Sequence, residues 1–206
     1  VGRVIARPFT GEYPNYVRTK NRHDFSLLPP GTTMLDQLSE NGFDVIAIGK
    51  IYDIFAGRWI TKAIRTGGND EGIARAIEWT KRDFQGLCFI NLVDFDMLYG
   101  HRNDVEGYAK GLTTVDRAIP EILAGLREDD LLMITADHGC DPSTPSTDHS
   151  REYTPWIIAG PNVKAGTNLG TLPTFADIGA TILDFFGVPQ KITGTSQLGN
   201  IITKSF

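Results

Sequence analysis

Carboxylate and imidazole side chains follow directly after an apolar run in the second half of the chain. Leu131 to Ile134 predicts a buried strand, and Asp137 and His138 come just after it. The carboxyl ends of strands in parallel sheets present functional groups to a crevice. Since aspartate and histidine both bind divalent transition metals, this strand end is a candidate metal site. Beyond a loop rich in Pro, Ser and Thr, His149 follows, and we expect it to fold back over the same strand end.

A second predicted strand ends in the same residue types. Residues 87–93 form an apolar run, Asp96 follows it, and His101 comes five residues later. One such pair is a weak signal, but three of the four histidines lie in these strand-end loops, and this clustering favours a metal site. Asp94 and Asp141 also lie beside the candidate ligands. Each is an alternative metal ligand to the candidate next to it, and spacing alone does not decide which one binds.

The candidate ligands are too many for one tetrahedral ion and are enough for most of a two-metal site. They are Asp96, His101, Asp137, His138 and His149. Mixed carboxylate and imidazole ligands favour Mn²⁺, Zn²⁺ or Fe²⁺ over Ca²⁺ or Mg²⁺. Two ions roughly 3.5–4 Å apart stabilise both the attacking and the leaving oxygen in phosphoryl transfer. Cys140 is interpreted as a packing residue or a support behind the ligands.

Basic residues are concentrated near the start of an acidic chain. Residues 1–22 hold five arginines and lysines against one acid, Glu12, whereas the whole chain has a net charge of -5. The guanidinium fork of arginine holds phosphate oxygens bidentately, which favours a phosphate-bearing ligand; a solvated basic face is the alternative. Lys50 follows a predicted strand at 45–48, so it either points to the same sheet edge as the metal ligands or is an ordinary surface lysine.

Apolar runs alternate with segments of helical periodicity along the chain. Helices are predicted between Thr32, as the N-cap, and Gly42, and over residues 69–84, 104–126 and 175–186; a further short strand is predicted over 156–159. Pro120 is expected to kink or divide the third helix. The alternation predicts an α/β fold with a mostly parallel sheet sandwiched between helices and joined by right-handed crossovers. The strand ends, with Lys50, Asp96, His101, Asp137 and His138, should therefore gather along one rim.

Composition excludes several classes of protein. The 206 residues are 41% hydrophobic, which is ordinary for a chain with a real core, and the pI of about 5.3 argues against general nucleic-acid binding. No apolar run approaches the ~20 residues that span a bilayer, and no signal peptide is evident, so a cytoplasmic protein is predicted. The two cysteines predict no disulfide framework. Because the chain opens on Val1 rather than Met, an N-terminal portion is expected to be absent.

Six segments, spread over nearly the whole chain, resemble the alkaline phosphatase superfamily of two-metal phosphoryl-transfer enzymes. They are residues 1–9, 18–26, 48–55, 94–102, 135–139 and 147–155. Thr-Ala-Asp-His-Gly at 135–139 also fits cofactor-independent phosphoglycerate mutases, so it indicates only the superfamily. The arginine-rich opening and Asp-His-Ser-Arg-Glu-Tyr at 148–153 narrow the resemblance to the phosphopentomutases.

The resemblance implies a role for each candidate residue. Asp96, His101 and His149 would hold one Mn²⁺ and Asp137 and His138 the other, which favours Asp96 over Asp94. The substrate contacts would be Arg3, Arg18 and Lys50 on the pentose phosphate, with Ile5 lining the sugar site. The implied reaction, part of nucleotide salvage, interconverts ribose 1-phosphate and ribose 5-phosphate, and the deoxyribose equivalents, through a phosphothreonine and a sugar bisphosphate.

The resemblance also divides the chain. It assigns residues 1–22 to the end of a cap domain and its return to the core, and residues 23–206 to the C-terminal part of the alkaline-phosphatase-like core, with the N-terminal part of the core missing. The family's nucleophilic threonine lies in a stretch that this chain does not contain, so no catalytic nucleophile is expected here. Two alternatives stay open: a phosphohydrolase of the same superfamily, or a non-catalytic α/β fragment.

Overall fold

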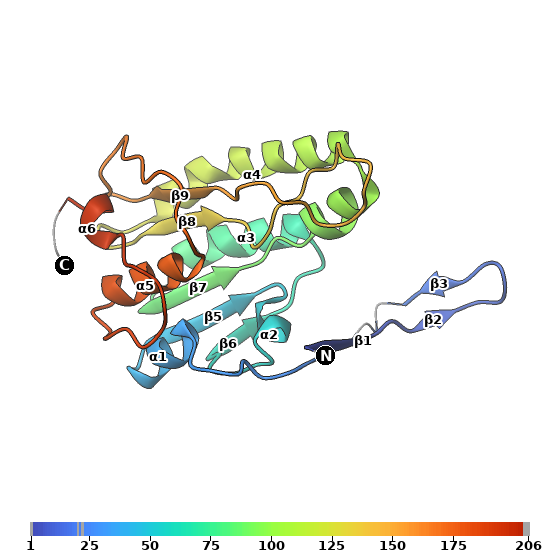
Figure 1. Ribbon diagram of the computed structural model, residues 1–206, viewed down its shortest axis with the longest axis horizontal. Coiled ribbons are helices and arrows are strands. Elements are labelled where there is room, and N and C mark those ends of the chain that lie inside the picture. Colours follow the sequence, from blue (N-terminus) through green and yellow to red (C-terminus); the bar gives the residue numbers. More distant parts are fainter. Residues whose placement is uncertain (1, 20, 22, 204–206) are drawn as a thin grey trace.

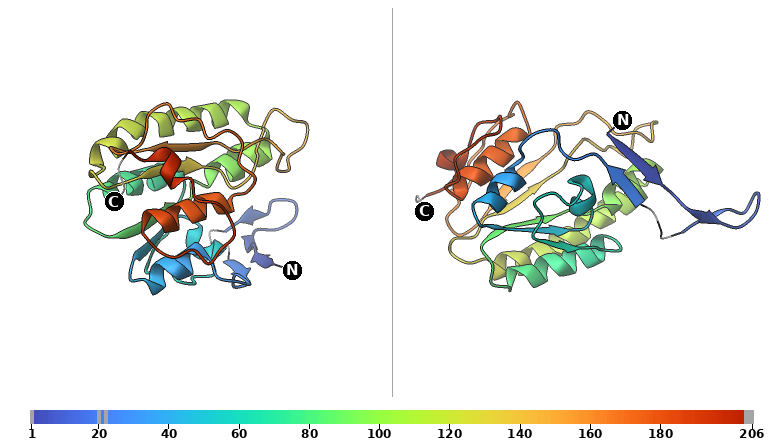
Figure 2. Two further views of the ribbon diagram at one scale, coloured as in Figure 1. Left: turned by 60° about the vertical axis from the view of Figure 1, so that its left-hand side comes forward. Right: turned by 90° about the horizontal axis from the view of Figure 1, so that it is seen from below.

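The computed structural model describes residues 2–19, 21 and 23–203, and its main body consists of strands covered by helices on both faces. The helices are α1 (Met34–Glu40), α2 (Ile51–Ile54), α3 (Asn69–Thr80), α4 (Val105–Gly125), α5 (Ala176–Phe185) and α6 (Leu198–Ile201). Figure 2 shows α3 and α4 together on one side of the strands and α1 and α5 on the other. The predicted α/β class is confirmed.

A three-stranded parallel sheet forms the centre of the body. Its order is β6 (Lys62–Ile64), β5 (Asp44–Ile48), β7 (Gly86–Ile90). Successive residues of β5 are buried on opposite faces, because side chains alternate along a strand. Val45 packs in one cluster with Leu38 of α1 and Leu183 of α5, whereas Ile46 packs with Trp79 of α3 in another. The middle strand therefore ties the two helical layers together.

The other two strands of the body differ from the predicted parallel arrangement. β8 (Leu132–Thr135) and β9 (Trp156–Ala159) pair antiparallel, with Thr135 opposite Trp156. A parallel partner requires a crossover, usually a helix, whereas the segment between these strands contains turns and bends and returns directly. The chain consequently leaves and re-enters this pair at the same end, and that end carries the candidate metal ligands.

Details of the helices correct two predictions and narrow a third. Thr33 is the N-cap of α1, not Thr32, because only Thr33 forms a capping box with Asp36. Pro120 lies inside α4 without dividing it, at a solvent-exposed position of the helix. α3 ends at Thr80, but Phe84 beyond it still packs edge-on against Trp79, with ring centroids 5.5 Å apart. None of the helices in the described part of the chain is long and apolar enough to cross a membrane.

The N-terminal residues form two antiparallel ribbons that sequence reasoning did not predict. β1 (Arg3–Ala6) pairs with β4 (His23–Ser26), and β2 (Phe9–Thr10) pairs with β3 (Val17–Arg18) in a hairpin that projects from the body (Figure 1). One strand of this ribbon, β1, thus precedes the predicted division at residue 22, and its partner β4 follows it. The division at that residue stays a prediction.

Candidate metal centre

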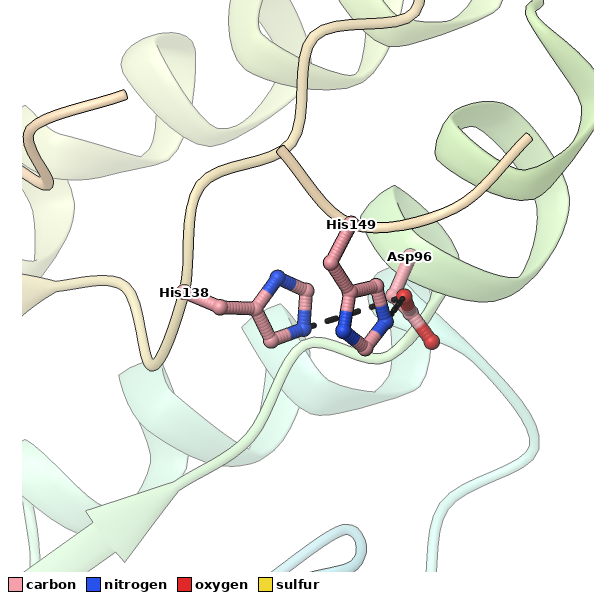
Figure 3. A group of neighbouring side chains, drawn as sticks. All are labelled: Asp96, His138 and His149. Carbon is pink, nitrogen blue, oxygen red and sulfur yellow. Dashed lines mark hydrogen bonds and ion pairs between the residues drawn. The ribbon is translucent and has the colours of Figure 1, made fainter. Parts of the chain in front are cut away.

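Three imidazoles surround one carboxylate oxygen at the end of the sheet. Asp96 Oδ1 lies 3.0 Å from His149 Nε2, 3.2 Å from His101 Nε2 and 3.8 Å from His138 Nε2. Ligand atoms of Asp96, His138 and His149 all lie within 4.8 Å of one another, and Figure 3 shows these side chains converging. Residues far apart in the sequence thus meet at one point, as the strand-end argument predicted for most of them.

Asp96 and His101 come from two short helical turns after β7. Asp96 belongs to η1 (Phe95–Tyr99), a π-helix, and His101 belongs to the following 3₁₀ turn, η2 (Gly100–Arg102). Wide π-helical turns are rare and occur often at functional sites. The tight succession of the two turns brings the imidazole back to the carboxylate.

His138 and His149 come from the loop between β8 and β9. An isolated antiparallel bridge joins Gly139 to Ser150, and Ser150 N donates to Gly139 O at 3.1 Å, which closes the loop directly behind both histidines. Only glycine fits at 139, because a Cβ atom there would lie 2.5 Å from Ser150 O. The two rings consequently stack, with centroids 3.6 Å apart and planes 14° apart.

Backbone carbonyls fix the orientation of two of the imidazoles. His101 Nδ1 lies 2.6 Å from Thr147 O, and His138 Nδ1 lies 2.9 Å from Gly139 O. A carbonyl oxygen only accepts hydrogen bonds, so each Nδ1 carries the hydrogen and, in the neutral ring, Nε2 has a bare electron pair. Those electron pairs face the Asp96 carboxylate, an arrangement that a cation between them stabilises. Metal-bound histidines usually donate their second ring nitrogen to a carbonyl in this way.

Asp137 is the most open of the predicted ligands. Its Oδ1 lies 3.7 Å from His138 Nε2, and 76% of its side chain is exposed. The five predicted metal residues therefore form one connected group, with Asp96 at its centre and Asp137 at its edge. Nitrogen and oxygen donors without thiolate fit Mn²⁺, Zn²⁺ or Fe²⁺.

The two rival aspartates face other partners. Asp94 Oδ2 accepts a hydrogen bond from Asn69 N at 2.7 Å, and Asp94 N donates to Asn69 Oδ1 at 2.9 Å, so Asp94 caps the start of α3. Asp141 Oδ1 accepts from the backbone and hydroxyl of Ser143, and these hydrogen bonds hold the pKa of Asp141 below its ordinary value. Neither carboxylate is directed to the imidazoles by these contacts.

The two cysteines are free, and both are partly buried. Burial raises the pKa of Cys88 to about 12. Burial also raises the pKa of Cys140, and the negative charge of Asp96 adds to that effect. Cys140 packs against Gly100, where a Cβ atom would lie 2.2 Å from its sulfur. The packing role interpreted for Cys140 fits this contact.

The predicted substrate residues lie on three different elements. Lys50 follows β5, and its Nζ lies 3.0 Å from Met97 Sδ, so it reaches the π-helix that carries Asp96. Arg3 in β1 pairs with Asp24 at 3.3 Å, and Ile5 of the same strand is half-buried. Arg18 is exposed on β3 of the projecting hairpin. The structure thus brings Lys50 to the π-helix that carries Asp96 and places the others on the N-terminal ribbons.

Sequence reasoning missed one residue beside the cluster. Asn103, which follows η2, has a left-handed backbone with φ of 52°, and its side-chain amide reaches the loop that carries His149. The available signal was an asparagine directly before the Asp104 N-cap, because asparagine adopts left-handed backbone more readily than most residues.

Comparison with known proteins agrees with this geometry. The model of the metalloenzyme superfamily matches residues 16–190, which include every residue of the cluster.

Phosphopentomutases from Lachnoclostridium phytofermentans and Acetivibrio thermocellus are 61% and 58% identical to the chain over 204 and 202 residues, 99% and 98% of its length. One from Caldanaerobacter subterraneus subsp. tengcongensis is 57% identical over 204 residues. In each case the match covers 52% of the relative, so the chain spans about half the length of these relatives. The extent of the family match and the histidine and aspartate cluster lead to one conclusion: the chain belongs to the metalloenzyme superfamily.

Proposed function

We propose that this chain supplies the metal-holding part of a phosphopentomutase, which interconverts ribose 1-phosphate and ribose 5-phosphate or their deoxyribose equivalents. The observation that carries the proposal is the convergence of three imidazole nitrogens within 3.0–3.8 Å of Asp96 Oδ1. The identity of 57–61% to relatives named phosphopentomutase, over almost the entire chain, supports this choice within the superfamily.

The proposed centre holds two Mn²⁺ ions. Asp96, His101 and His149 bind one ion, because both imidazoles lie within 3.2 Å of the same carboxylate oxygen. Asp137 and His138 bind the other, supported by the 3.7 Å contact between them at the open edge of the cluster. When bound, such ions offset negative charge on the phosphoryl oxygens during transfer. The carbonyls of Thr147 and Gly139 keep the imidazoles oriented, so that little reorganisation accompanies the reaction.

The proposed substrate is a pentose phosphate held by basic side chains. Lys50 contributes a cation beside the metal cluster, since its ammonium group contacts Met97, the neighbour of Asp96. Arg3 and Arg18 bind phosphate from the N-terminal ribbons, and Ile5 contacts the sugar. Residues 1–22 then belong to a cap and residues 23–206 to the core. The phosphothreonine lies outside this chain, a sugar bisphosphate restores it, and the reaction takes place in the cytoplasm.

A chimera tests the proposal. This chain replaces the matching half of the Lachnoclostridium phytofermentans relative, and conversion of ribose 5-phosphate to ribose 1-phosphate is measured with Mn²⁺ and a sugar bisphosphate. We expect mutase activity that falls at least about 100-fold when Asp137 and His138 are both changed to Ala. Asp129→Ala, an exposed aspartate before β8, is the matched control and should keep full activity.

Two results would overturn the proposal. Full activity of the chimera that carries Asp137→Ala and His138→Ala would show that these residues are not needed to bind the metal. Release of inorganic phosphate from ribose 5-phosphate, without formation of ribose 1-phosphate, would instead indicate a phosphohydrolase of the same superfamily.

A further inference from the structure

The side-chain amide of Asn103 is surrounded by backbone carbonyls of a distant loop. Its Nδ2 lies 2.7 Å from Thr144 O, 3.0 Å from Ser146 O and 3.3 Å from Pro142 O. The two hydrogens of one amide group thus serve three acceptors. The contacts join the end of η2 to a segment about 40 residues later in the chain.

The loop that Asn103 holds has no regular structure of its own. Residues 141–149 form turns and bends, with local hydrogen bonds such as Thr144 Oγ1 to Asp141 O at 3.0 Å. Such a segment depends on ties to the rest of the protein for a fixed position. Asn103 provides three of these ties from one side chain.

The same loop supplies two parts of the metal cluster. Thr147, which follows the Asn103 acceptor Ser146, accepts the hydrogen bond from His101 Nδ1 at 2.6 Å. His149, two residues later, lies 3.0 Å from Asp96. We propose that Asn103 is a positioning residue of the metal centre: its amide holds the loop so that the Thr147 carbonyl orients His101 and His149 reaches Asp96.

Asparagine meets both requirements of this position. The backbone at 103 has φ of 52°, which asparagine and glycine adopt more readily than other residues. Of these two, only asparagine carries amide donors. Aspartate has nearly the same shape but no donor, and its negative charge would face three carbonyl oxygens. Asn103→Gly and Asn103→Asp therefore remove the amide in two different ways.

Metal affinity tests this role, which rests on the proposed metal centre. Mn²⁺ is titrated calorimetrically into the full chain and into its Asn103→Gly and Asn103→Asp variants. We expect both variants to bind Mn²⁺ at least about tenfold more weakly than the unaltered chain. The matched control is Asn162→Asp. Asn162 Nδ2 also donates to a distant backbone carbonyl, Glu128 O at 2.7 Å, but at the opposite end of β8 and β9 from the cluster. Its substitution should leave Mn²⁺ affinity unchanged.

A second readout separates positioning from general stability. The visible absorption of Co²⁺ bound in place of Mn²⁺ reports the arrangement of the ligands, and we expect it to change in Asn103→Asp and not in Asn162→Asp, even where the two variants melt at the same temperature without metal. Unchanged affinity and spectrum in both Asn103 variants would overturn the role of Asn103. Failure of the unaltered chain to bind either ion would instead overturn the proposed metal centre, and this inference with it.

Discussion

Asp94 and Asp96 are two residues apart, and their carboxylates serve different parts of the protein. Asp94 Oδ2 accepts a hydrogen bond from the first backbone N–H of α3, on Asn69, at 2.7 Å. Asp96 Oδ1 lies 3.0 Å from His149 Nε2, in the middle of the histidine cluster. One short stretch after β7 therefore supplies both a helix cap and the proposed central metal ligand, and the two roles can be separated experimentally.

Asp96→Ala should abolish most metal binding at little cost in stability. We expect Mn²⁺ affinity to fall at least about 100-fold, while the free energy of unfolding without metal falls by about 1 kcal/mol or less, because the carboxylate contacts imidazoles that are themselves 42% and 49% exposed. Asp94→Ala should lower the free energy of unfolding by about 1–2 kcal/mol through the lost cap and keep Mn²⁺ affinity. Calorimetry and urea unfolding measure the two quantities, and the opposite pattern would exchange the roles assigned to these residues.

The buried Asp36 carboxylate, paired with Arg58, should make stability depend on pH in acid. Burial by itself raises the pKa of Asp36, but hydrogen bonds from Thr33 and the Arg58 guanidinium, 2.6 Å away, outweigh it and hold the pKa below its ordinary 3.8. The resulting stabilisation is complete above a pH of about 3.8, and it is lost as the pH falls through the lower pKa of the folded state. Asp36→Asn should cost about 2 kcal/mol at neutral pH and less near pH 3, as measured by urea unfolding.

An ion pair whose arginine is exposed provides the comparison for that measurement. Asp53 contacts Arg65 at 3.3 Å, but 70% of the arginine side chain is in solvent. Asp53→Asn should therefore change the free energy of unfolding by less than about 0.5 kcal/mol at either pH. Equal losses in both variants would contradict the special contribution of the buried carboxylate.

Close packing of Gly100 against Cys140 should appear as coupling between two substitutions. Gly100→Ala places a methyl group 2.2 Å from Cys140 Sγ and should lower the free energy of unfolding by about 1–3 kcal/mol. Adding Cys140→Ala removes the clashing sulfur, so the double variant should regain most of that loss. A double-mutant cycle from urea unfolding gives the coupling energy, and strictly additive effects would show that another contact limits residue 100.

Cys88 should resist alkylation until the chain unfolds. The thiol packs against the cluster of Ile46, Ile48 and Trp79, and burial raises its pKa from 9.0 to about 12. Only the thiolate reacts, so this pKa alone slows the reaction about a thousandfold near pH 8. Labelling a Cys140→Ser variant with iodoacetamide isolates Cys88, and the same protein in urea is the control. Rapid labelling of the folded chain would contradict the burial of this strand.

Sequence patterns identified the body of the fold better than its edges. Continuous apolar runs such as residues 45–48 predict buried strands, and β5, the middle strand of the sheet, is buried from Val45 to Ile48. β6 and the N-terminal ribbons were missed, because their short strands are exposed and carry no clear apolar pattern. The direction of β9 could not be predicted either, since periodicity indicates which residues are buried and not which way a strand runs.

The cluster itself was largely predictable, whereas its supports were not. Asp96, His101, His138 and His149 have the residue types of metal ligands and follow strand ends, so chemistry and topology pointed to the same group. The interactions that orient them use the carbonyls of Thr147 and Gly139. Every residue has a backbone carbonyl, so no choice of side chain records which ones accept these bonds.

The antiparallel pairing of β8 and β9 affects how such a centre can change in evolution. Because Thr135 and Trp156 are directly opposite each other, the whole segment between them begins and ends at adjacent points. The length and composition of this segment can vary without shifting either strand. New chemistry at this rim can then arise by remodelling the loop that faces Asp96 and His101, while β8 and β9 keep their register.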